Sequence, residues 1–141
     1  MNATSDDPIL NSGAEPKIEA GADEIYIQAF RNVDLGFWRD EGGTDNWIGV
    51  TADRKIATKF RQHFADNVLY LTSGTNSWLS YRARGAFGLG LKMRGWIYAA
   101  KWKLEPDGKL LCLNNGKFVG TEGGYFYANS ENVVMLKFIK I

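Results

Sequence analysis

Short runs of alternating apolar and polar residues dominate the chain from Glu24 to its end, and breaks rich in Gly, Asn and Asp separate them. Alternation with a period of two is typical of half-buried β-strands, whereas a helix needs an apolar stripe with a period near 3.6. No window carries a sustained helical stripe, and proline is scarce. Residues 1–23 show neither period and are rich in Asn, Ser, Asp, Gly, Pro and Ala. The pattern predicts a flexible N-terminal tail over residues 1–23, outside the core, and one all-β domain over residues 24–141.

The apolar pattern repeats three times within that domain. Each repeat opens with an alternating triplet, and the three triplets are Ile25-Tyr26-Ile27, Leu69-Tyr70-Leu71 and Leu111-Cys112-Leu113. An aliphatic residue and then a small one follow in each repeat, and each repeat closes on an aromatic residue: Phe60, Trp102 and Phe138. Units of about 40 residues with four short strands suit either a propeller blade or one third of a β-trefoil. Three blades are too few for a propeller, so the pattern predicts a β-trefoil with pseudo-threefold symmetry.

The second and third strands of each repeat are expected to pair as a hairpin, in the register that turns apolar residues toward the core. This register pairs Leu35 with Val50 and Phe37 with Ile48, Leu79 with Leu91 and Tyr81 with Leu89, and Val119 with Ala128 and Thr121 with Phe126. Gly123-Gly124 suits the positive φ angles of a two-residue turn. The predicted core comprises Ile27, Leu35, Val50, Phe60, Leu71, Leu79, Leu91, Trp102, Leu113, Val119, Ala128 and Phe138.

The third repeat resembles a fascin-like, actin-crosslinking-type β-trefoil. The resemblance runs through the opening strand, Asn115-Gly116-Lys117, Phe118-Val119, and a hairpin that ends in Ala128-Asn129. The other two repeats share only the apolar skeleton. The resemblance implies the trefoil fold, and trefoils of this kind include actin-bundling proteins, lectins, and modules of toxins and enzymes. The Gln-x-Trp signature of ricin-type lectins is absent, and residues 62–64 are the nearest stretch.

The first hairpin carries aromatic residues that this register does not bury. With Leu35 and Val50 pointing inward, Trp38 and Trp47 face each other on the outer surface, with Asp40 and Asp45 on the same face toward the tip. Asn46 lies near the tip on the other face and is a further candidate. Sugar rings stack on aromatic faces, and their hydroxyls bond to carboxylates and amides. This arrangement predicts a sugar site, with Asn115 and Asn129 as a weaker polar site. The alternative is a cross-strand Trp pair that only stabilises the hairpin.

The net charge and the chemically reactive residues exclude further classes of function. Net charge is +1, from 17 basic and 16 acidic residues, which argues against capture of nucleic acid or membrane. The single His63 and the single Cys112 form no catalytic pair and no zinc motif, and Asp40, Glu41 and Asp45 lack calcium-loop spacing. We therefore expect no enzymatic activity, no cofactor, no metal and no membrane insertion. The lack of disulfides and of a secretory signal favours a cytoplasmic protein, with non-classical release left open.

The sequence thus predicts a non-catalytic, lectin-like carbohydrate-binding module whose partner is a glycan. The alternative is a fascin-like module that binds actin or another protein, within a toxin or defence system. For that alternative, the basic stretch Arg82-Ala83-Arg84 with Lys92, Arg94 and Trp96 is the candidate surface, and a solvated, charge-balanced face is its simpler interpretation.

Overall fold

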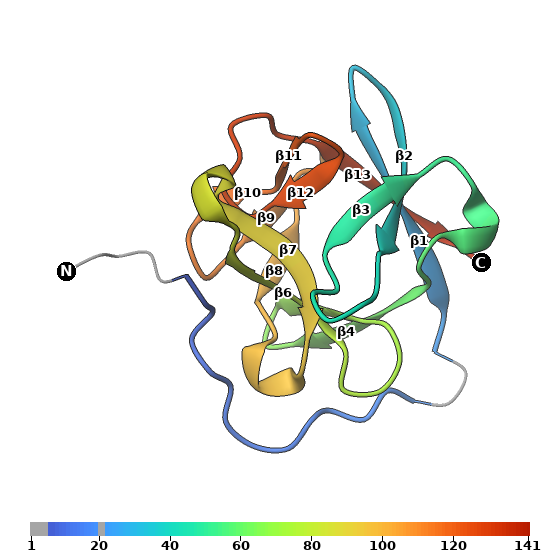
Figure 1. Ribbon diagram of the computed structural model, residues 1–141. Helices are drawn as coiled ribbons and strands as arrows, with labels where there is room; N and C mark the ends of the chain where they lie inside the picture. The colour runs from blue at the N-terminus through green and yellow to red at the C-terminus, as the bar shows by residue number, and fades with distance from the viewer. Residues whose placement is uncertain (1–5, 20–21) are drawn as a thin grey trace.

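The computed structural model describes residues 6–19 and 22–141, which form an all-β protein (Figure 1). The strands are β1 (Glu24–Arg31), β2 (Val33–Asp40), β3 (Ile48–Thr51), β4 (Phe60–Ala65), β5 (Val68–Thr72), β6 (Trp78–Ala83), β7 (Leu89–Arg94), β8 (Trp102–Leu104), β9 (Leu110–Cys112), β10 (Lys117–Phe118), β11 (Gly120–Glu122), β12 (Tyr125–Tyr127) and β13 (Met135–Lys140). Three 3₁₀ turns interrupt them, η1 (Arg54–Ile56), η2 (Gly85–Phe87) and η3 (Trp96–Tyr98). Among the described residues, a helix with the length and apolarity of a membrane span is not found.

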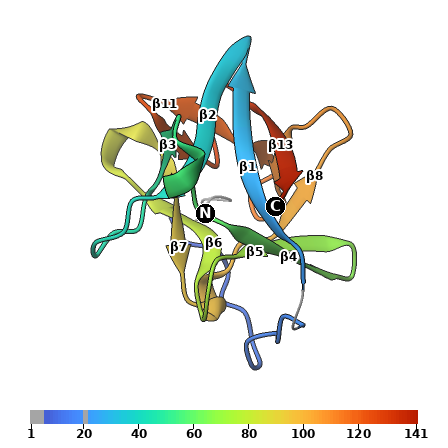
Figure 2. The ribbon, with the colours of Figure 1, turned by 90° about the vertical axis from the view of Figure 1, so that its right-hand side faces the viewer.

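The strands pair in an antiparallel manner, and β1 has three partner strands. β1 pairs with β13 and with β2, and its first residues pair with β4. The succession of neighbours continues from β4 to β5, from β5 to β8 and from β8 to β9. An isolated bridge between Lys109 and Met135 joins the residue before β9 to the first residue of β13. Figure 2 shows β1 between β2 and β13, with β4 and β5 crossing below them.

Three hairpins, β2–β3, β6–β7 and β11–β12, meet beside this succession of strands. Tyr127 of β12 pairs with Gly90 of β7, and an isolated bridge joins Trp47 to Lys92. The backbone N–H of Met93 also donates to the carbonyl of Asn46. Residues from all three hairpins therefore come together, although they lie far apart in the sequence.

The register of the third hairpin is confirmed, and that of the second is displaced by two residues. Thr121 lies opposite Phe126, and Gly123 and Gly124 have φ angles of 57° and 83° at the tip. In the second hairpin Tyr81 pairs with Leu91 rather than with Leu89. Because side chains alternate with a period of two, an even displacement leaves the same residues facing the core.

The predicted register of the first hairpin is wrong by three residues. Trp38 pairs with Val50 rather than with Trp47, and Asp40 pairs with Ile48. The tip is longer than predicted because residues 41–47 all lie in the loop, where Asn46 takes a positive φ of 52° and its N–H donates to the carbonyl of Gly42. An odd displacement turns one strand over relative to the other. Ile48 and Val50 keep the core side as predicted, and in β2 their face is shared by Trp38 rather than by Phe37.

Most of the predicted core is buried. Its confirmed members are Ile27, Phe60, Leu71, Leu79, Leu91, Trp102, Val119 and Ala128. Leu35, Val50 and Phe138 are partly buried and pack against this core. Leu113 is wrong, because β9 ends at Cys112 and the Leu113 side chain, in the turn that follows, is 40% exposed.

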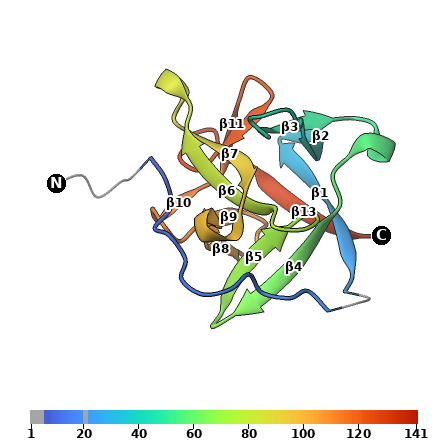
Figure 3. The same cartoon turned by 60° about the horizontal axis from the view of Figure 1, so that its bottom comes forward.

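Residues 6–19 and 22–23 of the predicted tail are described, and residues 6–19 lie against the domain (Figures 1 and 3). The side-chain amide of Asn11 donates to the carbonyls of Trp96 and Ala99. The Glu15 carboxylate accepts from the indole N–H of Trp78, and Ile18 packs against the cluster that contains Trp78. These contacts hold residues 6–19 against the domain, although none of them belongs to the main core. The remainder of the tail prediction, residues 1–5 and 20–21, lies outside the described residues.

Candidate functional site

Trp38 does not belong to a surface site. Its side chain is fully buried, and its ring lies 5.2 Å from that of Phe126 and 6.2 Å from that of Phe60, between ring centroids. Its indole N–H is buried without a hydrogen-bond partner in the described residues. The predicted outward Trp pair is therefore wrong, because the observed register differs from the predicted one by three residues and places Trp38 on the core side.

Trp47 is partly exposed, but its ring is in contact with cationic side chains. The guanidinium carbon of Arg84 lies 4.7 Å from the ring centroid, and the ammonium of Lys92 lies 4.9 Å from it. Gly90 permits this packing, since a Cβ at that position would lie 2.8 Å from the Trp47 ring. Trp47 thus packs against the second hairpin, and cation–π attraction stabilises the contact.

The polar residues of the first hairpin tip do not gather around Trp47. Asp40 accepts the backbone N–H of Gly42, and Asp45 is exposed. Asn46 contributes its backbone to the loop and to the bond with Met93. Asp40 and Asn46 therefore shape the tip and its contact with β7.

Asn115 and Asn129 use their side chains to hold the backbone. Asn115 accepts the N–H of Lys117 at 2.9 Å and donates to the carbonyl of Ala128 at 3.1 Å. Asn129 accepts the N–H of Leu89 at 3.0 Å, which ties the third repeat to the residue that follows the η2 loop. Asn129 is thus placed to position that loop, and Asn115 holds the turn before β10.

The basic residues of the second hairpin do not form one surface. Arg82 is exposed, whereas Lys92 is buried, and burial lowers its pKa, with Arg94 and Arg82 lowering it further. Arg94 forms an ion pair with Asp7 at 2.6 Å and stacks on Tyr98. The surface predicted to contact actin is therefore divided between buried, paired and exposed residues.

A pocket of about 300 Å³ lies between the second and third hairpins. Its lining comes from the η2 loop and from the β11–β12 hairpin, and comprises Arg84, Phe87, Glu122, Gly123, Tyr125 and Tyr127. Figure 1 shows η2 beside β12, although the two elements are about a quarter of the chain apart. The Phe87 side chain is 68% exposed, so an aromatic face is available at the mouth of this pocket.

The charged groups of this hairpin pocket are held in place by neighbours. The Arg84 guanidinium carbon lies 4.0 Å from the Tyr125 ring centroid and contacts Trp47 as well. The Tyr125 hydroxyl donates to Glu41 at 2.6 Å, and this bond to a carboxylate is the main cause that raises the Tyr125 pKa. One oxygen of Glu122 accepts from Asn132 at 2.6 Å and from Ser130 at 3.2 Å. These bonds hold the carboxylate, and its second oxygen has no partner in the described residues.

The hairpin pocket offers recognition groups, namely the rings of Phe87 and Tyr125, one guanidinium and one carboxylate, whereas Tyr127 is buried. His63 lies elsewhere, with its ring 5.9 Å from that of Tyr70. Cys112 is buried, and burial raises its pKa to about 11, so it is protonated near neutral pH. In residues 6–19 and 22–141, no group of three or more His, Cys, Asp or Glu side chains is arranged to hold a metal ion.

Sequence reasoning identified Arg84 as part of a basic stretch but missed the rest of the lining. A signal was present at Tyr125 and Tyr127, which alternate with the inward Phe126 and so face away from it. Phe87, an aromatic residue between two glycines in a loop, was a second signal. Comparison with protein-family models, with curated protein sequences and with solved structures finds no match for this chain. The chemistry of the pocket is therefore what bears on function.

Proposed function

We propose that the chain is a β-trefoil that binds carbohydrate without catalysis, in the pocket between its second and third hairpins. The trefoil assignment is supported by the succession β13, β1, β4, β5, β8 and β9, together with the Lys109–Met135 bridge. These contacts suit a barrel of six strands, and the three remaining hairpins suit its cap. Each third of the chain supplies two of the six strands and one hairpin.

The observation that carries the functional proposal is the exposed Phe87 ring in one pocket with the Glu122 carboxylate. A sugar ring has C–H faces that stack on an aromatic ring and hydroxyls that donate to a carboxylate oxygen. Glu122 has one oxygen held by Ser130 and Asn132, so the other is oriented as an acceptor. A volume near 300 Å³ is at the lower end for ligand pockets and suits a single sugar ring.

A glycan array followed by titration calorimetry tests this proposal. For the sugar found on the array, Phe87→Ala is expected to weaken binding about tenfold, which corresponds to about 1.4 kcal/mol. Glu122→Gln is expected to weaken binding about tenfold or more, since a hydrogen bond to a charged group is lost. Phe64→Ala and Glu131→Gln are matched controls, because these exposed residues lie outside this pocket.

Unchanged affinity in both pocket variants would place the sugar elsewhere on the protein. An actin co-sedimentation assay run in parallel tests the alternative suggested by the third repeat. If actin binds and no sugar does, the carbohydrate proposal is wrong. Salt dependence of the actin interaction would then be expected, since the remaining exposed basic residues would mediate it.

A further inference from the structure

Residues 6–19 occupy a groove of the domain without becoming part of its strands. The backbone N–H of Asn11 donates to the carbonyl of Ile97, and its side-chain amide donates to the carbonyls of Trp96 and Ala99. One residue thus satisfies three acceptors of the η3 turn. The side-chain amide of Asn carries two N–H donors, so it can satisfy two backbone carbonyls at once.

A second anchor lies four residues further along the segment. One carboxylate oxygen of Glu15 accepts both the indole N–H of Trp78 at 2.6 Å and the backbone N–H of Asn76 at 2.7 Å. Ile18 then packs against the aromatic cluster of Tyr70, Trp78 and Trp96. Toward the start of the segment, Asp7 pairs with Arg94. The groove thus binds a carboxamide, a carboxylate and an aliphatic side chain, those of Asn11, Glu15 and Ile18, at fixed spacing along the segment.

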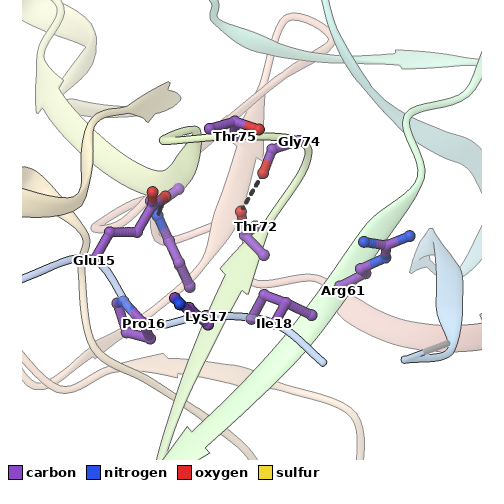
Figure 4. A pocket seen from close by; sticks show the side chains of 9 residues that line it. Glu15, Pro16, Lys17, Ile18, Arg61, Thr72, Gly74 and Thr75 are labelled. Carbon is purple, nitrogen blue, oxygen red and sulfur yellow. Dashed lines mark hydrogen bonds between the residues drawn. The ribbon is translucent and has the colours of Figure 1, made fainter. Parts of the chain in front are cut away.

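The segment is held at these anchors and at Pro8, which is buried. A cavity of about 490 Å³ lies between residues 15–18 of the segment and the β4–β5 region of the domain, as Figure 4 shows. Between Pro8 and Asn11, Ile9 and Leu10 are 81% and 57% exposed. None of the segment's residues belongs to the main core, and Ile18 packs on the smaller cluster of Tyr70, Trp78 and Ala99.

We propose that this groove is a peptide-recognition site and that its ligand in trans is the same segment, residues 6–19, of a second copy of the chain. The fit of the segment is the evidence for this ligand, because the groove already binds it through Asn11, Glu15 and Ile18. Charge is complementary as well, since the segment carries Asp6, Asp7, Glu15 and Glu19 against one lysine, and the groove presents Arg94. Reciprocal exchange of the segment would give a two-fold symmetric dimer.

A tether raises the effective concentration of the bound segment to the millimolar range, so the segment of one chain competes strongly with that of another. The test therefore uses two full-length variants, in each of which the segment and the groove of the same chain no longer match. Asn11→Ala with Glu15→Gln gives a chain with a defective segment and an intact groove. Trp78→Phe gives a chain with an intact segment and a groove that lacks the indole donor for Glu15.

The two variants are expected to be monomeric alone and to form a heterodimer when mixed, as measured by sedimentation velocity. A synthetic peptide of residues 6–19 should bind the segment-defective chain, and should displace the groove-defective chain from it. The same peptide with Asn11→Ala and Glu15→Gln is the control. It should bind more weakly by a factor of about ten at least.

Each other result overturns the proposal. If the peptide binds but no heterodimer forms up to about 1 mM, the range of a tethered segment, the groove does not serve a second copy. If the peptide binds no more tightly than its altered control, the groove does not recognise these side chains. If the segment-defective chain fails to unfold cooperatively in urea, residues 6–19 are part of the fold rather than a ligand of it.

Discussion

Replacing Trp38 by Ala is expected to lower the free energy of unfolding by about 3–5 kcal/mol, the usual cost of removing a large buried aromatic side chain. Trp38 is fully buried against Phe60 and Phe126, so the substitution leaves a cavity that the strands around it cannot fill. Small domains have a total stability of about 5–15 kcal/mol, so the loss is a large fraction of it.

Trp47→Ala is the matched comparison, because Trp47 is the aromatic residue that was predicted to lie opposite Trp38. Its partly exposed ring loses two contacts with cations, Arg84 and Lys92, each of about 0.5–1 kcal/mol. The expected loss is about 1–2 kcal/mol. Trp38→Phe is a second comparison. It keeps a ring in the core and removes an indole N–H that is buried without a partner, so it should cost less than Trp38→Ala.

Urea unfolding followed by far-ultraviolet circular dichroism measures all three variants, since this signal comes mainly from the backbone. With a slope of about 2 kcal/mol per molar, Trp38→Ala should lower the midpoint by about 1.5–2.5 M. A loss below about 1 kcal/mol for Trp38→Ala, equal to that for Trp47→Ala, would refute the burial of Trp38. It would restore the register in which the two residues form an outward pair.

Three further predictions concern other parts of the molecule. Gly90→Ala should destabilise the protein by about 1–3 kcal/mol in urea unfolding and weaken sugar binding, because the added Cβ would displace the Trp47 ring that packs on Arg84; unchanged values would contradict this packing. Cys112 should make the free energy of unfolding depend on pH, because burial raises its pKa to about 11. The stabilisation from the buried neutral thiol is complete below the ordinary thiol pKa near 9 and is lost as the pH rises toward 11. Over that range wild type should lose up to about 2–3 kcal/mol relative to Cys112→Ala, and parallel curves would refute it. Glu15→Gln should lower the free energy of unfolding, measured by thermal denaturation, by about 1.5–3 kcal/mol, because Trp78 and Asn76 lose a charged acceptor. Glu19→Gln should have little effect.

The sequence alone determined the all-β character of the protein and most of the core. Alternation with a period of two marks strands wherever a sheet has one buried face, and this signal is local. It therefore placed the third hairpin in its correct register, where Gly123-Gly124 defines a two-residue tip. The same signal was available for Tyr125 and Tyr127, which lie on either side of the inward Phe126.

Tertiary structure decided which face of the first hairpin is buried and where a pocket lies. Both Phe37 and Trp38 are buried, so alternation could not show which of them faces the core. The length of the loop over residues 41–47 set the register, and its hydrogen bonds involve β7, which is distant in the chain. The pocket joins Phe87 to Glu122, and the groove joins Asn11 to the η3 turn. Such pairs depend on how separate strands pack together, and the local pattern of a sequence carries no information about that.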